Sequence, residues 1–212
     1  PPHPTALDAL VLHGHYRDVF AAHARHAATP GRLCYFGLIR DYKGVDRLLE
    51  AFEGTAQELE LRLVGRPQTP AWRELVERAV ATDPRVTARL ELVDDDELVG
   101  EVSASELVVL PYRELHNSGT VLVALSLDRP VLVPATPSTL ALAEEVGPGW
   151  VLTFEGELSS QTLPAALARV RAGGRSERPA LEGRDWSRVS AGYAEVLRLA
   201  GRGHRAARRA AR

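Results

Sequence analysis

A short polar loop followed by an apolar helix is the part of the sequence best suited to bind an anion. The loop ends in Asn117, Ser118, Gly119 and Thr120, and the helix begins near Val121. The first N–H groups of a helix have no partner inside it, and a glycine lets a phosphate come close to the backbone. The serine and threonine hydroxyls add further hydrogen-bond donors. The same residues also suit a plain helix cap, so on their own they leave both interpretations open.

A second polar loop, residues 37–44, carries positive charge. It follows the apolar run from Leu33 to Phe36 and contains Arg40 and Lys43. Guanidinium and ammonium groups are the side chains that bind phosphate oxygens most strongly. This loop is therefore a candidate for the opposite side of a diphosphate site.

Short apolar runs alternate with segments that have helical periodicity, and this alternation predicts how the two loops are placed. It indicates an α/β fold with a doubly wound, parallel, six-stranded sheet and helices on both faces. The expected strands are residues 33–36, 59–64, 86–93, 106–110, 131–133 and 150–153. The expected helices are residues 45–52, 72–81, 94–102, 121 to the break at Pro130, 140–146, 159–171 and 186–199.

The common strand order 3-2-1-4-5-6 would open a crevice between the first and fourth strands, where the winding direction reverses. Loops 37–44 and 111–120 would then face each other, which favours the phosphate interpretation. No G-x-G-x-x-G fingerprint and no Walker pattern is present. Leu92 and Val93, at the end of the third strand, offer an apolar slot for a base. We therefore expect a nucleoside diphosphate that carries another group.

The composition is that of a soluble globular protein. The chain of 212 residues is 45% hydrophobic and 25% charged, with a net charge of −2. This near neutrality gives no support for nucleic acid or a membrane surface as the main partner. No segment is long and apolar enough to cross a bilayer and no signal peptide is visible, so we expect a cytoplasmic protein. Cys34 is the only cysteine and is expected in the core.

The ends of the chain differ from its centre. The sequence contains no methionine, so we expect either a piece of a longer polypeptide or a processed N-terminus. Residues 1–30 are predicted to be an interdomain linker or the remnant of an N-terminal domain, residues 31–200 the regular domain, and residues 201–212 a basic tail that frays. A metal site at His13 and His15 is disfavoured, because alternate residues of an extended segment point to opposite sides and no carboxylates or thiols accompany them.

Four stretches carry a resemblance to a known family. They are FGLIRDYKGVDRLLEAF at 36–52, LRLVGRP at 61–67, LVDDDELVGEVSASELVVLPY at 92–112 and NSGTVLVALSLDRPVLVP at 117–134, and DWSRVSAGYAEVLRLA at 185–200 resembles the family's closing helix. The chain resembles the C-terminal, donor-binding domain of a GT-B glycosyltransferase of family four, the bacterial group 1 glycosyl transferases. The fold implied is the Rossmann-like half of GT-B, and the ligand implied is a nucleotide-sugar.

The resemblance also implies site residues, although it assigns no catalytic residue. The family arginine that usually follows the glycine of the first loop is replaced by Leu38, and two family glutamates are replaced by Leu115 and Val123. The residues implied are Gly37, Arg40, Lys43, Ser118, Gly119 and Thr120 for the diphosphate, Gly65, Arg66, Val93 and Asp94 for the base, and Glu114, His116 and Asn117 for the sugar.

The mechanism implied is glycosyl transfer from the nucleotide-sugar, in a role such as polysaccharide or glycolipid assembly. No cofactor and no metal is expected, because the helix start and the cations take the place of a divalent ion. The acceptor would bind to a separate N-terminal domain, so this chain alone should be inactive. The only link to the inner face of the membrane would be a lipid-linked acceptor.

Two other functions remain open from the sequence. One is a non-catalytic nucleotide or protein interaction module, which the missing glutamates make conceivable. The other is a GT-B nucleotide-sugar epimerase, which needs acid and base carboxylates in the crevice, where the loops offer only Asp41 and Glu114.

Overall fold

The computed structural model describes residues 11–113 and 119–210, with the side chains described up to residue 200. The chain divides into two compact units. One unit is Tyr16–Ala180, which contains the whole sheet. The other consists of Leu181 onward together with the described residues that precede Tyr16.

The sheet of the larger unit has six strands, all parallel, in the order β3-β2-β1-β4-β5-β6. This confirms the doubly wound α/β fold predicted from the sequence. The winding direction reverses between β1 and β4, as the predicted order requires. The strands are β1 (Arg32–Phe36), β2 (Glu60–Val64), β3 (Val86–Arg89), β4 (Leu107–Val109), β5 (Val131–Pro134) and β6 (Val151–Phe154).

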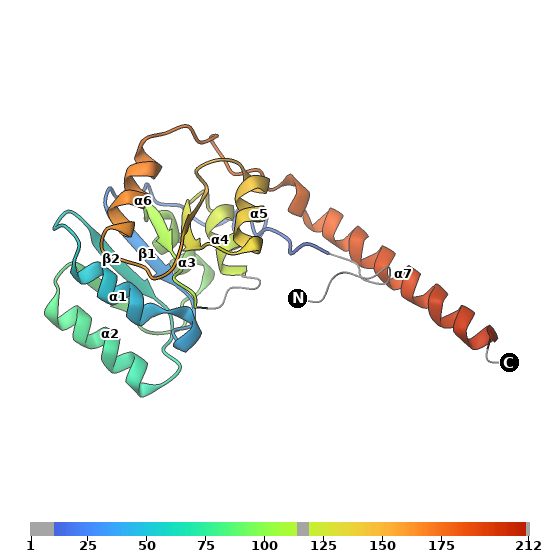
Figure 1. The fold of residues 1–212 in the computed structure, drawn as a ribbon, viewed down its shortest axis with the longest axis horizontal. Helices are drawn as coiled ribbons and strands as arrows, with labels where there is room; N and C mark the ends of the chain where they lie inside the picture. The colour runs from blue at the N-terminus through green and yellow to red at the C-terminus, as the bar shows by residue number, and fades with distance from the viewer. Residues whose placement is uncertain (1–10, 114–118, 211–212) are drawn as a thin grey trace. The chain divides into compact units, whose positions relative to one another are not determined.

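Helices flank the sheet on both faces (Figure 1). Crossovers between parallel strands are right-handed, so the helices of the two halves lie on opposite faces when the winding reverses. The larger unit contains α1 (Val45–Glu53), α2 (Pro70–Thr82), α3 (Asp95–Ser103), α4 (Gly119–Ser126), α5 (Pro137–Val146), α6 (Thr162–Arg171) and the short 3-10 helix η1 (Asp41–Lys43).

The central strands are buried because helices cover both faces of the sheet. The three residues of β4 are fully buried, as are Leu33, Cys34 and Tyr35 of β1. Burial raises the pKa of the Cys34 thiol to about 12, which keeps it protonated at neutral pH. The expectation that this cysteine is a core residue is confirmed.

Strand β3 is shorter than the sequence pattern predicts. The alternation of apolar residues continues to Val93, but β3 ends at Arg89. Its only neighbour is β2, whose last residue, Val64, pairs with Arg89. Beyond that point no strand remains to pair with, so the residues after β3 leave the sheet and Leu92 becomes 84% exposed.

The second unit contains η2 (Glu182–Arg184) and the long helix α7 (Trp186–Ala210). His15 Nε2 lies 2.8 Å from Asp185 Oδ1, and the Trp186 indole N–H donates a 2.8 Å hydrogen bond to the His15 carbonyl. The helix continues beyond residue 199, where the sequence predicted a fraying tail. Alanine and arginine are strong helix formers, which explains the extension. None of the helices in the described ranges is long and apolar enough to cross a membrane.

Candidate functional site

A cavity of about 610 Å³ opens where β1 and β2 end. It is lined by the residues that follow these two strands, by the segment after β3, by the first turns of α3 and α4, and by residues 16–20. The carboxyl ends of parallel strands next to a switch in winding are the usual ligand site of such sheets. The lining is mostly apolar, with Phe20, Phe36 and Val123 among its side chains.

Two glycines bring main chain to the edge of this cavity. The Gly37 N–H donates to the Val64 carbonyl over 2.9 Å. Gly65 has a φ of 146°, and a Cβ on it would lie 2.0 Å from the Gly37 carbonyl oxygen. A Cβ on Gly37 would meet nothing within 4 Å. The contact between the ends of β1 and β2 is therefore formed by main chain alone. No side chain of Gly37 projects into the cavity, so the space next to this residue stays open.

Two cations lie farther along the loop after β1. Lys43 is the only lysine of the chain, and it is only 9% exposed. Its Nζ lies 3.8 Å from the centre of the Tyr112 ring and 5.3 Å from that of Tyr42, and the Arg40 guanidinium lies 4.4 Å from the Tyr42 ring. Within the described part of the chain, neither cation pairs with a carboxylate. Two positive charges thus stand together over aromatic rings, and no described carboxylate neutralises them.

The loop after β1 lies against the loop after β4. The Arg113 N–H donates to the Tyr42 carbonyl over 2.8 Å, and a Cβ on Gly44 would lie 2.1 Å from the Pro111 carbonyl oxygen. Gly44 has a φ of 67°, so only glycine fits both the conformation and the space. The sequence predicted that these two loops face each other, and their described parts are in contact.

Burial, together with the positive charge of Arg40, lowers the pKa of Lys43 from 10.5 to about 8. Between pH 8 and 10.5 the unfolded chain binds more protons at this position than the folded chain. The free energy of unfolding therefore rises with pH in this window. The rise should be on the order of 3 kcal/mol larger in the wild type than in Lys43→Met.

Denaturant unfolding of both proteins at pH 7.5 and pH 10 measures this difference. The other ionisable groups are common to both proteins, so the comparison isolates the contribution of Lys43. Equal pH dependence in the two proteins would contradict the lowered pKa of Lys43.

The structure places the predicted site residues in four groups. Glu114, His116, Asn117 and Ser118 lie outside the described residues. Arg40 and Lys43 lie beyond the cavity lining, in the same loop as Gly37. Asp94 caps α3, where its carboxylate accepts a 2.9 Å hydrogen bond from the Glu97 N–H. The cavity lining includes Gly37, Gly65, Arg66, Val93, Gly119 and Thr120.

Sequence reasoning missed one wall of the cavity. Tyr16, Val19 and Phe20 line it, although they lie in the stretch predicted to be a linker. Phe20 is 3% exposed, and its ring stacks on that of Tyr16 with the centroids 6.0 Å apart. The spacing i, i+3, i+4 is that of apolar residues on one face of a helical turn, and it is the signal that could have indicated this wall.

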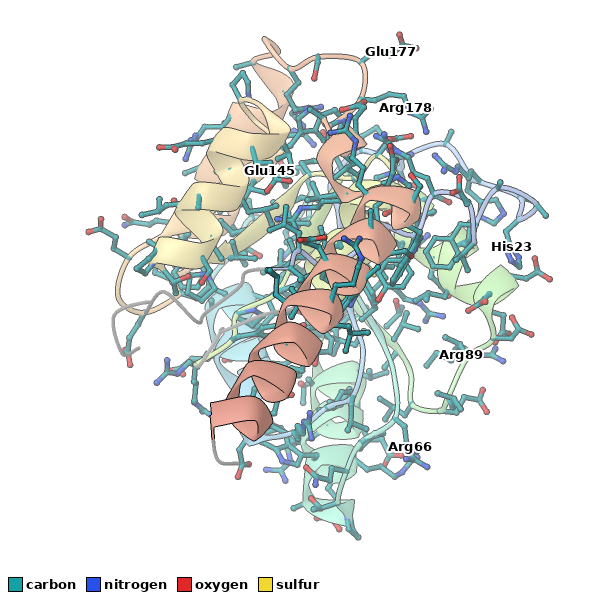
Figure 2. All side chains as sticks on the ribbon, turned by 90° about the vertical axis from the view of Figure 1, so that its right-hand side faces the viewer. His23, Arg66, Arg89, Glu145, Glu177 and Arg178 are labelled. Carbon is teal, nitrogen blue, oxygen red and sulfur yellow. The ribbon has the colours of Figure 1, made fainter. Side chains whose placement is uncertain are left out.

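The histidines and acidic residues do not gather into a metal site in the described residues, where no group of three or more metal-ligating side chains occurs. Figure 2 shows the side chains of His23, Arg66 and Arg89. His23 Nδ1 lies 2.6 Å from Asp96 Oδ1, and Arg89 pairs with Glu97 over 2.6 Å. Donor binding without a metal stays a prediction.

The model of the family described as glycosyl transferases group 1 matches residues 30–170. The chain belongs to this family. The membership confirms the resemblance read from the sequence, and glycosyl transfer is the reaction of the class.

This group 1 glycosyl transferase is 52% identical over 190 residues to the GDP-mannose:glycolipid 4-beta-D-mannosyltransferase of Xanthomonas campestris pv. campestris. The match covers 89% of this chain and 54% of that relative, so the chain spans about half the length of the curated relatives it matches.

Solved structures share the fold at lower identity. AviGT4, a glycosyltransferase involved in avilamycin A biosynthesis, matches with a TM-score of 0.56 and 16% identity, over 84% of this chain and 54% of that one. The Anabaena protein HepE, solved with UDP and glucose, matches with a TM-score of 0.55 and 19% identity, over 80% of this chain and 48% of that one. Both similarities concern the fold, the GT-B arrangement predicted above.

Proposed function

We propose that this chain binds the nucleotide-sugar donor of a mannosyltransferase, with GDP-mannose as the donor and a glycolipid as the acceptor. The donor and acceptor classes are those in the name of the Xanthomonas relative. A glycolipid acceptor would bring the reaction to the cytoplasmic face of a membrane. The chain matches about half of that relative, so we place the acceptor side of the reaction in the half of the relative that this chain does not match.

One observation carries the proposal. An apolar cavity large enough for a nucleotide lies at the switch in winding. The loop that supplies Gly37 to it also supplies Arg40 and Lys43, which pair with no carboxylate among the described residues. An apolar space beside two neighbouring cations matches a base and ribose joined to a diphosphate. Gly119 and Thr120 add the start of α4 to the same cavity.

These groups act on the leaving nucleoside diphosphate. When the bond between the sugar and the distal phosphate breaks, negative charge grows on the phosphate oxygens. The ammonium of Lys43, the guanidinium of Arg40 and the N–H groups at the start of α4 stabilise that charge as it develops. Their positions are set before the reaction by packing on Tyr42 and Tyr112.

The acidic side of the cavity favours guanine. Asp95 and Glu91 are part of the lining, and Glu91 also pairs with Arg89 over 3.0 Å. Guanine presents two adjacent N–H donors on its Watson–Crick edge, which a carboxylate accepts with both oxygens. This is the feature of the cavity that supports GDP over other diphosphates.

Thermal unfolding of the chain with added nucleotides tests the proposal. We expect GDP at one hundred times its dissociation constant to stabilise the fold by about 2.7 kcal/mol, and so to raise Tm by several degrees. UDP and ADP at the same concentration should raise Tm less. Asp95→Asn should reduce the preference for GDP and leave the Tm of the free protein unchanged, because Asp95 is exposed.

Two outcomes would contradict the proposal. If no nucleoside diphosphate changes Tm at millimolar concentration, the chain is an interaction module and does not bind a donor. If UDP or ADP stabilises the chain more than GDP does, the donor is a different nucleotide-sugar.

A further inference from the structure

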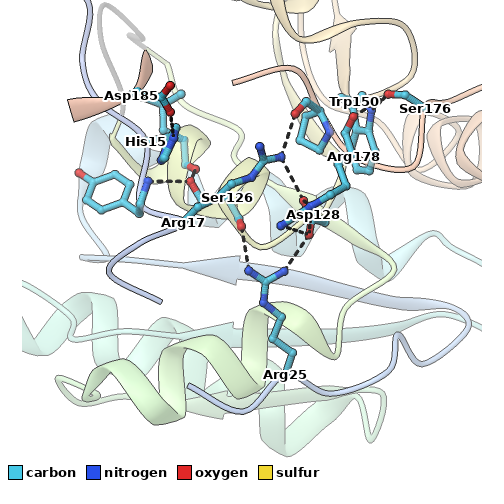
Figure 3. A network of polar contacts seen from close by, with 12 residues as sticks. His15, Arg17, Arg25, Ser126, Asp128, Trp150, Ser176, Arg178 and Asp185 are labelled. Atoms are coloured by element: carbon cyan, nitrogen blue, oxygen red, sulfur yellow. Dashed lines mark hydrogen bonds and ion pairs between the residues drawn. The ribbon is translucent and has the colours of Figure 1, made fainter. Parts of the chain in front are cut away.

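Three arginines meet one aspartate in the turn between α4 and β5. The Asp128 carboxylate lies 3.3 Å from Arg17, 2.7 Å from Arg25 and 3.2 Å from Arg178 (Figure 3). These arginines come from the segment before β1 and from the segment after α6. A single carboxylate thus joins three parts of the larger unit that are far apart in sequence.

The same end of α4 also holds the segment before β1 through its main chain. The Ser126 hydroxyl accepts a 2.9 Å hydrogen bond from the Tyr16 N–H and donates to the Leu122 carbonyl over 2.6 Å. The Ser126 carbonyl accepts a 3.2 Å hydrogen bond from Arg25. Ser126 is fully buried, so these bonds are shielded from water.

The segment held in this way is a wall of the cavity. Tyr16, Val19 and Phe20 line it, and so do Gly119 and Thr120 at the opposite end of α4. One end of α4 therefore lines the cavity, while the other end anchors the segment that lines the facing side.

We propose that Asp128 is a positioning residue for the donor nucleotide: through Arg17 and Arg25 it holds residues 16–20 in place as a wall of the cavity. This inference rests on the proposed function, because it takes the cavity to be the nucleotide site. Asp128 itself is not among the residues that line the cavity.

The charge balance at Asp128 makes the position of the wall sensitive to this carboxylate. The side chains of Arg17 and Asp128 are only 17% and 21% exposed, so water screens their charges little. Without the carboxylate, three guanidinium groups would remain close together and repel one another. Arg17 also donates to the Pro179 carbonyl over 2.8 Å, which keeps it near the other two. The expected result is displacement of the segment that carries Arg17 and Arg25.

The variant Asp128→Asn tests the proposal with little change in shape. Asp128 has a φ of 56°, and asparagine tolerates this left-handed conformation as well as aspartate does. We expect the affinity of Asp128→Asn for GDP, measured by calorimetry on the whole chain, to fall about tenfold. Its affinity for inorganic pyrophosphate should stay unchanged, because Arg40 and Lys43 are not part of the wall.

A double-mutant cycle separates positioning from general destabilisation. Val19 is 50% exposed and lines the cavity, so Val19→Ala should weaken GDP binding without unfolding the protein. In the Asp128→Asn background that substitution should have no further effect, because the wall is already displaced. Asp83→Asn is the matched control: Asp83 pairs with Arg85 over 2.6 Å, away from the cavity, and its loss should leave GDP affinity unchanged.

Hydrogen exchange gives a second readout that needs no nucleotide. We expect faster exchange in residues 16–25 of Asp128→Asn, and unchanged exchange in β1 and β4. If exchange and GDP affinity both match wild type, or if GDP and pyrophosphate affinities fall equally, the positioning role is overturned. If the wild-type chain does not bind GDP, the proposed function fails, whereas the exchange result still decides whether Asp128 holds the segment.

Discussion

Lys43→Met is expected to weaken the binding of GDP between about tenfold and a hundredfold. Methionine keeps an unbranched apolar chain over the Tyr112 ring but removes the ammonium, the only one carried by a side chain in this protein. A charge-assisted contact to the diphosphate is lost, while Arg40 keeps its own contact and retains part of the affinity. Calorimetry at pH 7, where the wild-type lysine is charged, measures the effect.

Two further variants show whether the lost charge is responsible. Lys43→Arg keeps the positive charge and should retain more affinity than Lys43→Met. Arg169→Met removes an exposed cation in the last turn of α6, outside the cavity lining, and it should leave GDP binding unchanged. If Lys43→Met binds GDP as tightly as wild type does, the diphosphate does not lie against this lysine.

Gly65→Ala is expected to lower the free energy of unfolding by about 3 kcal/mol, a large effect for a single methyl group. A Cβ at this position would lie 2.0 Å from the Gly37 carbonyl oxygen, which is main chain and cannot rotate away. The φ of 146° is also unfavourable for any residue except glycine. Urea unfolding of the variant and the wild type measures the loss.

Gly156→Ala is the matched control for this prediction. Gly156 also has a positive φ, 68°, but a Cβ there would meet nothing within 4 Å. Gly156→Ala should lower the free energy of unfolding by about 1 kcal/mol, which is the cost of the left-handed backbone conformation alone. If Gly65→Ala costs no more than Gly156→Ala, the close approach of the two glycines does not constrain the fold.

The sequence was sufficient to predict the sheet and the helices that cover it. Buried parallel strands are continuous apolar runs, and β4 and β5 stand out for that reason. The alternation of strands and helices predicted the class of fold. The usual strand order of this class then predicted that loops 37–44 and 111–120 lie next to each other. The glycines that follow β1 and β2 were named as site residues because of the family resemblance, whereas their close approach to each other was not predicted.

The remaining features depend on contacts between distant parts of the chain. The alternation of apolar and polar residues continues beyond Arg89, as is typical of a strand. Strand β3 nevertheless stops there because the neighbouring strand β2 ends at the residue that pairs with Arg89. The segment that contains Phe20 lacks regular structure, so its role as a wall depends on α4. Nothing in the sequence around Asp128 indicates that Arg17 and Arg178 would both reach it.

The contact of Gly37 with Gly65 has a consequence for how this family diverges. Because main chain meets main chain there, the distance between the ends of β1 and β2 is not set by a side chain at this point. Side chains around the cavity can therefore be substituted without changing this contact. This is consistent with proteins of 16% and 19% identity superimposing on the chain over most of its length.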